Sequence, residues 1–156
     1  MIILGIDPGT TRAGFGVIKK EKGIFSLLES GILETNSKDP SEILSKLSSH
    51  LEKIIKKHKP ELAAIEKLYF SKNKKTALSV AEARGVILLS LKNNSIPIIE
   101  FSPTEIKSCL TGSGRAEKKD VIRSVELILK QKIEGVDDIS DALAAAILAS
   151  SRLQTI

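Results

Sequence analysis

The N-terminal stretch constrains the fold more than any other part of the chain. A largely apolar run from Ile2 to Ile6 ends abruptly at Asp7-Pro8-Gly9. Such a run predicts a short buried strand that carries a carboxylate at its C-terminal end. Asp-Pro-Gly is also a common turn for purely conformational reasons. Asp7 therefore indicates a functional site only if the rest of the chain supplies partners for it.

A second carboxylate is expected at the same edge of the sheet. The chain after Asp7 is predicted to form two hairpin strands and one helix with an apolar face, at residues 14–20, 24–35 and 40–59. The next apolar run, residues 62–65, ends at Glu66. A strand, helix, strand order in one sheet implies a parallel crossover, which brings Glu66 beside Asp7. Taken alone, Glu66 is also explained as a solvent-exposed residue at a strand end.

Aromatic and basic residues are interleaved shortly after Glu66. Tyr69 and Phe70 are followed by Lys72, Lys74 and Lys75. This mixture beside an acidic site suits a nucleic-acid strand, because bases stack on rings and phosphates pair with lysines. The segment is equally consistent with one core aromatic residue and an exposed basic loop, and core packing is the favoured interpretation for Phe70.

The helix predicted at residues 76–91 is apolar around most of its circumference. A helix of this kind is covered on two sides. The sheet accounts for one side. A second copy of the chain, or complete burial within one subunit, accounts equally well for the other. One more strand is predicted at residues 96–101, and a short helix that starts near Ser102 carries Lys107.

A loop and a helix further along form a second basic region. The loop at residues 111–115 contains two glycines and ends at Arg115, and the helix predicted at residues 117–132 carries Lys118 and Lys119 in its first turn. Backbone amides at a helix start, together with these cations, suit a phosphate group. The glycines alone are also explained by an ordinary turn.

The final segment supplies two further carboxylates. Asp138 and Asp141 are three residues apart, so they lie on one face of the predicted last helix, whose other residues are mostly small and apolar. Helix capping explains one of them but not both. Asp137 is expected to point away from that face, because neighbouring residues on a helix lie about 100° apart.

Length and composition narrow the class of protein. A chain of 156 residues fits a single domain over residues 1–156, and 24 Lys and Arg against 19 Asp and Glu give a net charge of +5, which favours a polyanionic partner. The single cysteine, Cys109, rules out an intrachain disulfide and is expected to be buried. His50 and His58 have no metal-ligand partner and are expected at the surface. No apolar run approaches the roughly 20 residues needed to span a bilayer, so we expect a cytoplasmic protein.

Asp7, Glu66, Asp138 and Asp141 together predict a metal site. Neither His nor Cys competes as a ligand, and clustered carboxylates suit hard cations such as Mg²⁺, with Mn²⁺ as a substitute. Two such ions about 4 Å apart clamp the attacking and leaving oxygens of a phosphodiester displacement. With basic surroundings to hold the substrate, the sequence predicts metal-dependent hydrolysis of nucleic acid.

Four motifs make the sequence similar to one family. They are G-I-D-P-G-T at 5–10, I-E-K-L-Y-F-S-K-N at 65–73 continued by A-L-S-V-A-E-A-R-G at 77–85, T-G-S-G-R-A-E-K at 111–118, and D-I-S-D-A-L-A-A-A-I at 138–147. Over nearly its whole length the chain resembles the RuvC-type Holliday junction resolvases of the ribonuclease H-like superfamily. The resemblance implies an α/β fold with a five-stranded mixed sheet, three antiparallel N-terminal strands followed by two parallel ones, flanked by helices on both faces.

The same resemblance implies a function. Resolvases of this type are homodimers that bind a four-way junction and nick two strands of like polarity, leaving 5′-phosphate and 3′-hydroxyl ends, in DNA recombination and repair. By position, the four carboxylates match the family's metal-binding catalytic set. Tyr69 matches an aromatic residue that contacts an unstacked base, and Lys107 and Lys118 match basic residues implicated in catalysis or DNA contact. The helix at 76–91 is the expected dimer contact, and the partners RuvA and RuvB are implied by the resemblance alone.

Three other classes share part of this pattern. Actin-like ATPases and sugar kinases have a similar G-I-D-x-G-T-T loop but need two such domains, which 156 residues do not supply. A non-catalytic DNA-binding module has no need of four acids at these positions. A RuvC-like nuclease of RNA processing, or a hybrid-cleaving ribonuclease H, shares the fold. The Tyr69 segment and the motif at 77–85 favour a junction resolvase over either of these nucleases.

Overall fold

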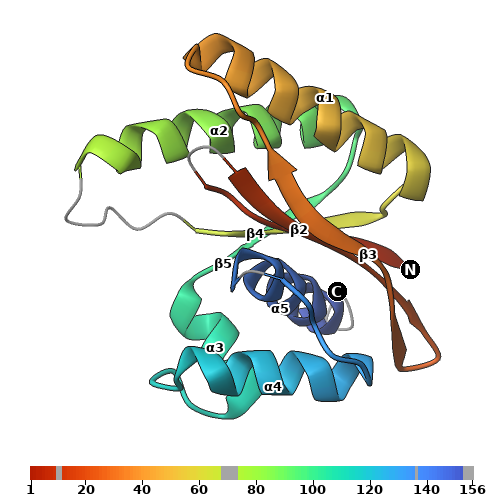
Figure 1. Cartoon of the computed structure of the whole chain (residues 1–156). Coiled ribbons are helices and arrows are strands. Elements are labelled where there is room, and N and C mark those ends of the chain that lie inside the picture. Colours follow the sequence, from red (N-terminus) through yellow and green to blue (C-terminus); the bar gives the residue numbers. More distant parts are fainter. Residues whose placement is uncertain (10–11, 68–73, 136, 153–156) are drawn as a thin grey trace.

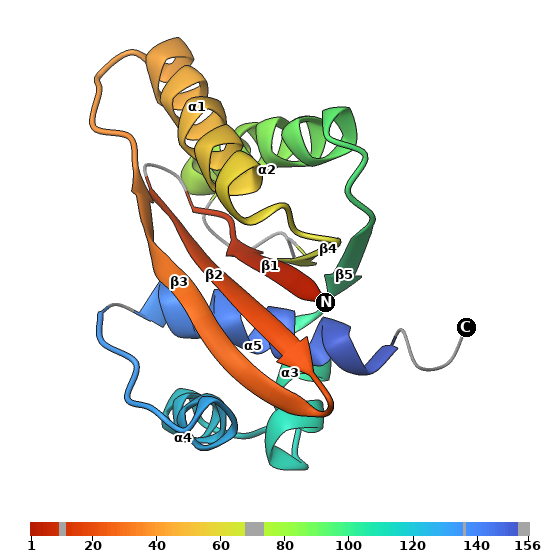
Figure 2. The same cartoon turned by 90° about the vertical axis from the view of Figure 1, so that its right-hand side faces the viewer.

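A five-stranded sheet in the order β3-β2-β1-β4-β5 divides the molecule into two halves (Figures 1 and 2). The computed structural model describes residues 1–9, 12–67, 74–135 and 137–152, and for residues 74 and 75 the backbone only. Neighbouring strands β1, β2 and β3 are antiparallel, and β4 and β5 continue the sheet parallel to β1. The strands span Ile2–Asp7, Arg12–Glu21, Ile24–Glu34, Leu62–Glu66 and Ile98–Phe101 in chain order. This confirms the predicted mixed sheet.

Helices cover both faces of the sheet. On one face lie α1 (Pro40–His58) and α2 (Lys74–Asn93), and on the other lies α5 (Asp137–Arg152). The short α3 (Pro103–Thr111) and α4 (Lys118–Leu129) pack on α5 on the side away from the sheet (Figure 1). The sheet is therefore flanked by helices on both faces, as the resemblance implied.

Alternation along the strands decides which side chains meet which helices. On β1, Leu4 and Ile6 pack with α1 and α2, whereas Ile3 belongs to the core under α5. On β4, Ile65 faces α1 and α2, and Ala64 faces α5. Successive side chains of a strand point to opposite faces. The residues that follow Ile6 and Ile65 therefore point to the α5 face.

Local signals explain where two of the helices begin and end. The Asp39 side chain accepts a hydrogen bond from the Ser41 amide at the start of α1, and Lys59 in the left-handed conformation ends it. At the start of α3, Ser102 and Glu105 form a reciprocal capping box. Gly112 ends α3 in the left-handed conformation, which glycine adopts without strain.

Helix α5 approaches the sheet at backbone distance. A Cβ added at Gly5 on β1 would overlap the carbonyl oxygen of Ala142, and a Cβ added at Gly14 on β2 would overlap the backbone of Asp138. The helix residues that lie against Gly5 are the small, buried Ala142 and Ala146. Glycine on the strands and alanine on the helix are thus both needed for this spacing.

Several sequence expectations need correction. The predicted helix 117–132 ends earlier, at Leu129, because Lys130 adopts a left-handed conformation there. Cys109 is exposed, because α3 is a short outer helix that buries Ile106 and turns its other side outward. The His58 side chain is only 11% exposed and bonds Glu29, because the end of α1 folds back onto β3. In the part of the chain that the structure describes, no helix is long and apolar enough to cross a membrane.

The close contact of α5 makes a stability prediction. We expect Gly5→Ala to lower the free energy of unfolding by roughly 2–4 kcal/mol, because the added methyl group must push a buried helix off the sheet. The measurement is urea unfolding at fixed protein concentration in the presence of a chelator.

Ser49→Ala is the control. Ser49 is exposed in the middle of α1, so the change should leave the stability unchanged or raise it by about 0.5 kcal/mol. Equal urea midpoints for Gly5→Ala and Ser49→Ala would contradict the close packing of α5 on β1.

Candidate active site

Asp7 and Glu66 lie at the ends of two adjacent parallel strands. In the pairing of β1 with β4, Ile6 lies opposite Ile65. The next residue on each strand is the acid, and strand alternation turns both acids toward α5. The negative charge of Glu66 acts directly on Asp7. The crossover thus brings together two carboxylates that are far apart in the sequence.

The first turns of α5 add the other two carboxylates. The backbone of Asp138 lies on Gly14, which is the residue paired with Asp7 between β2 and β1. Asp141 follows one turn further along the same face of α5. The Asp138 and Asp141 side chains are 26% and 27% exposed, respectively. Backbone contact between helix and sheet therefore sets the position of the second pair relative to the first.

Burial and mutual repulsion raise the pKa values of this group. Burial, followed by the charges of Glu66, Asp141 and Asp138, raises the pKa of Asp7 from 3.8 to about 8. Burial and the charge of Asp141 raise the pKa of Glu66 to about 7. The pKa of Asp141 is also raised, mainly by burial, although Lys118 opposes the effect. The protein thus holds more negative charge here than its own groups compensate.

Two cations of the chain pair with the acids of α5. The Lys118 Nζ lies 2.9 Å from Asp141 Oδ2 and 3.3 Å from Asp137 Oδ2. The Arg12 Nε lies 2.8 Å from Asp138 Oδ2. Burial lowers the pKa of Lys118, but its bonds to Asp141 and Asp137 outweigh this and raise it overall. Asp137 is 63% exposed, but it does not point away from this face as expected: it shares Lys118 with Asp141, because residues four apart lie on the same side of a helix.

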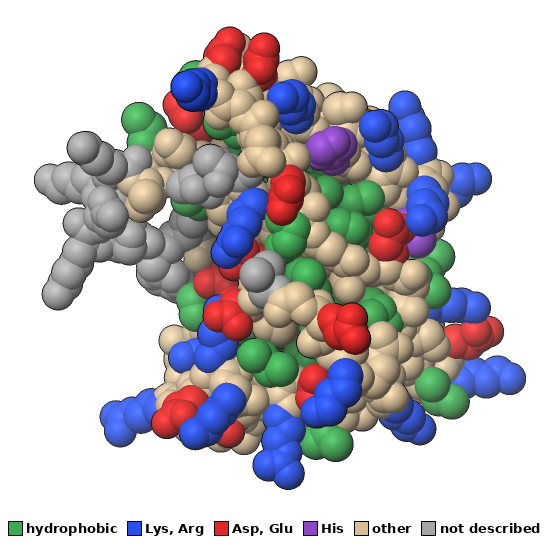
Figure 3. All heavy atoms as spheres, in the orientation of Figure 1, with side chains coloured by type: hydrophobic (Ala, Val, Ile, Leu, Met, Phe, Trp, Pro, Cys, Tyr) green, Lys and Arg blue, Asp and Glu red, His purple; other side chains and the backbone are tan. Residues whose placement is uncertain are grey.

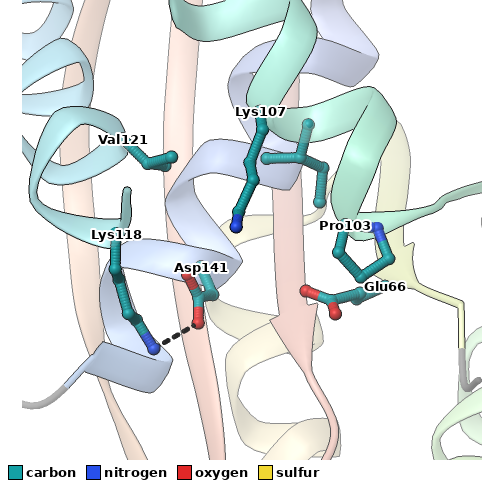
Figure 4. Close-up of a pocket in the computed structure, with 7 residues that line it drawn as sticks. Glu66, Pro103, Lys107, Lys118, Val121 and Asp141 are labelled. Atoms are coloured by element: carbon teal, nitrogen blue, oxygen red, sulfur yellow. Dashed lines mark ion pairs between the residues drawn. The ribbon is translucent and has the colours of Figure 1, made fainter. Parts of the chain in front are cut away.

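A pocket of about 210 Å³ opens beside Glu66 and Asp141. Figure 4 shows Lys107 reaching from α3 so that its ammonium group points into the space between these two carboxylates. Its charge partly offsets the rise in the pKa of Glu66. Figure 3 shows acidic side chains gathered between the two helical layers, with basic side chains on either side. An anionic substrate group that enters the pocket therefore meets Lys107 and Lys118 beside the acids.

The four carboxylates have the right chemistry to bind a divalent cation, but their side chains are too far apart in this conformation to share one ion. They provide only oxygen donors, which Mg²⁺ and Mn²⁺ prefer, and their excess negative charge favours a bound cation. Among the described residues, however, no three His, Cys, Asp or Glu side chains are placed so that they could hold one ion. Asp138 and Asp141 are engaged by Arg12 and Lys118, so side-chain rotation has to accompany cation binding.

The predicted DNA-contacting residues are only partly within the described structure. Tyr69, Phe70 and Lys72 lie outside the described residues, as do the side chains of Lys74 and Lys75. Arg115 and Lys119 are exposed near the start of α4, where Lys119 pairs with Glu117. The Asp120 carboxylate accepts a hydrogen bond from the Glu117 amide at this helix start. Acidic side chains therefore lie beside the basic ones at this helix start.

Sequence reasoning missed Arg12. It is the first residue of β2, the strand paired with β1, whose end carries Asp7. A basic residue at that position was the available signal. Its partner, Asp138, is far away in the sequence, so the pair becomes visible only once α5 lies on the sheet.

The raised pKa of Asp7 predicts a pH-dependent stability. The folded protein holds the Asp7 proton more tightly than the unfolded chain does, so stability falls as the pH rises from about 4 toward about 8. Asp7→Asn removes the ionisation. In the presence of a chelator, we expect this variant to be more stable than the wild type at pH 8 by roughly 1–3 kcal/mol.

Urea unfolding at pH 4.5 and pH 8 measures this difference, and the gain should shrink at the lower pH. Glu134→Gln, at an exposed position outside the site, is the control and should change neither value. If the difference in stability between the wild type and Asp7→Asn were the same at both pH values, the ionised Asp7 carboxylate would not be destabilising the folded protein.

Comparisons with known proteins agree with this geometry. The family model described as "Crossover junction endodeoxyribonuclease RuvC" matches residues 3–149. A protein of that name from Petrotoga mobilis is 47% identical over 149 residues, which cover 94% of this chain and 91% of the relative. The structures titled "Thermus thermophilus RuvC structure" and "T. thermophilus RuvC in complex with Holliday junction substrate" match with TM-scores of 0.89 and 0.88 at 28% and 26% identity, each covering 99% of this chain and 98% of the other. The chain therefore belongs to the RuvC family of crossover junction endodeoxyribonucleases.

Proposed function

We propose that this chain resolves four-way DNA junctions in recombination and repair by nicking two strands of like polarity, with 5′-phosphate and 3′-hydroxyl products. The observation that carries the proposal is the grouping of Asp7, Glu66, Asp138 and Asp141 at one edge of the sheet in a chain of the RuvC family. The solved complex of T. thermophilus RuvC with a Holliday junction substrate supports the substrate class.

RuvC nucleases are metal-dependent in general, and we propose Mg²⁺ as the ion here, two per site, with Mn²⁺ as a substitute. Asp7, Glu66, Asp138 and Asp141 are the residues that would hold the ions. When bound, such ions polarise the phosphodiester and assist the ionisation of the attacking water. Asp7 and Glu66 must lose their protons to act as ligands, so cation binding and proton release are coupled.

The basic residues of the site have separate tasks in this proposal. Lys107 points into the pocket between Glu66 and Asp141, where it binds a phosphate oxygen of the strand to be cut. Lys118, 46% exposed, exchanges its bond to Asp141 for a phosphate contact when DNA enters. Further along the strand, the DNA contacts are assigned to the remaining predicted residues, Tyr69, Phe70, Lys72, Lys74, Lys75, Arg115 and Lys119.

We also infer a homodimer through α2. Ala83, Ile87 and Leu91 are buried against the rest of the chain, but the opposite face exposes a row of small and apolar residues at helical spacing, Leu78, Ala81, Gly85 and Leu89. Leu78 and Leu89 are 67% and 61% exposed. Burial of the whole helix within one subunit is thereby excluded, and a second copy is the natural cover. A two-fold dimer presents two equivalent sites to a two-fold junction.

The proposed substrate has consequences for location and partners. Four-way junctions arise where the genome is recombined, so we place the protein in the cytoplasm with the DNA. RuvA and RuvB, which move such junctions, are proposed as partners on family membership alone.

The first test of this function is cleavage of four end-labelled substrates of matched sequence. These are a four-way junction, a linear duplex, a single strand and an RNA–DNA hybrid. With Mg²⁺ we expect paired, ligatable nicks in the junction alone. Asp7→Asn should reduce cleavage by about 100-fold or more, because loss of a direct ligand costs at least as much as loss of a residue that merely supports one.

Junction binding in calcium or chelator is the control, and Asp7→Asn should retain it because the change removes a negative charge from the DNA-facing site. Cleavage of the hybrid instead of the junction would move the function to RNA removal. Binding without any cleavage would favour a non-catalytic module.

The dimer has its own test. Leu89→Glu places a charge in the proposed contact, so we expect a monomer at micromolar concentration by light scattering after size exclusion, and loss of paired nicking. Leu127→Glu is the control, because Leu127 is 70% exposed on α4 at the other side of the molecule and should leave the dimer intact. A wild-type monomer on junction DNA would contradict the two-fold arrangement.

A further inference from the structure

Arg12 holds one of the four carboxylates through a direct ion pair. Its Nε lies 2.8 Å from Oδ2 of Asp138, which is the geometry of a charge-assisted hydrogen bond. The Arg12 side chain is 52% exposed, whereas that of Asp138 is 26% exposed. The pair therefore sits at the rim of the site, with the cation on the solvent side and the acid on the inner side.

Arg12 and a divalent cation compete for the same carboxylate, that of Asp138. Arg12 occupies one oxygen of the Asp138 carboxylate and places a positive charge beside it, so it opposes a divalent cation at this carboxylate both by occupying Oδ2 and by charge repulsion. The Oδ2 atom that accepts from Arg12 has to be released, or the carboxylate turned, before a divalent cation can use it.

Arg12 has an obvious alternative partner when DNA is present. A guanidinium group matches a phosphate as well as it matches a carboxylate, with two parallel hydrogen bonds. Because its side chain is more than half exposed, Arg12 can turn outward without leaving its own charge buried. A strand lying over the acidic site brings phosphates to this rim.

We propose that Arg12 is an internal competitor of the metal ion at Asp138, and that a DNA phosphate relieves the competition by taking the guanidinium group. The proposal rests on the metal site proposed above and deepens it by adding regulation. Metal binding and DNA binding then strengthen each other by the same factor, as linkage requires. Arg12 thus restrains metal loading, and with it cleavage, until a substrate is in place.

The first measurement is Mn²⁺ affinity by calorimetry on the full chain without DNA. Arg12→Gln should bind Mn²⁺ about two- to tenfold more tightly than the wild type, the range expected for removal of a partly exposed ion pair. Arg12→Lys keeps the charge and should lie between the two. Lys19→Gln is the matched control, because Lys19 lies on the same strand, pairs with Glu21 at 2.7 Å and is 44% exposed. It removes the same charge away from the site and should leave the affinity unchanged.

The second measurement repeats the titration with a junction whose crossover linkages cannot be hydrolysed. DNA should tighten Mn²⁺ binding in the wild type by more than it does in Arg12→Gln, because the variant has no competition to relieve. Without metal, Arg12→Gln should bind the junction more weakly than Lys19→Gln, with a salt dependence lowered by about one phosphate contact.

Two outcomes overturn the proposal, and they are distinguishable. Equal or weaker Mn²⁺ binding by Arg12→Gln, with binding still lost in Asp7→Asn, removes the role of Arg12 and leaves the metal site standing. Absence of any Asp7-dependent Mn²⁺ binding in the wild type removes the metal site itself, and the inference falls with it.

Discussion

The backbone of α5 lies directly on the β1–β2 hairpin, and this contact positions the acidic site. At Gly5 and Gly14 there is no room for a side chain between strand and helix, and the helix residue above Gly5 is the small Ala142. An ordinary helix on a sheet is separated from it by a layer of large side chains. That layer is missing at Gly5 and Gly14, so Asp138 lies beside the strand end that carries Asp7, and two distant segments form one acidic group.

That group works against folding. Burial and repulsion raise the pKa values of Asp7 and Glu66 to about 8 and about 7, which means that their charged forms destabilise the folded chain. The chain offsets part of this with Arg12 and Lys118. Functional sites commonly keep such local conflicts because the same excess charge that weakens the fold strengthens the affinity for a cation. Stability and function are thus opposed at this edge of the sheet.

In our proposal, one face of the sheet carries the active site and the other carries the dimer contact. The α5 face carries the acids and the lysines that meet the substrate. The other face carries α1 and α2, and the outer side of α2 exposes Leu78 and Leu89 for a second subunit. Glu66 ends β4, and α2 begins at Lys74. The proposed active site and the proposed dimer contact are therefore connected by one short segment of chain.

The succession of strands and helices, the mixed sheet and the proximity of Asp7 to Glu66 could all be predicted from the amino-acid sequence. Those features depend on alternation, turn residues and the crossover rule, all of which are local or topological. The folded chain was needed to show that Arg12 binds Asp138, that Lys118 bridges two acids, that His58 lies largely covered against Glu29 and that Cys109 faces outward. Each of these depends on which side chains of remote segments meet and at what depth, which no periodicity within one segment encodes.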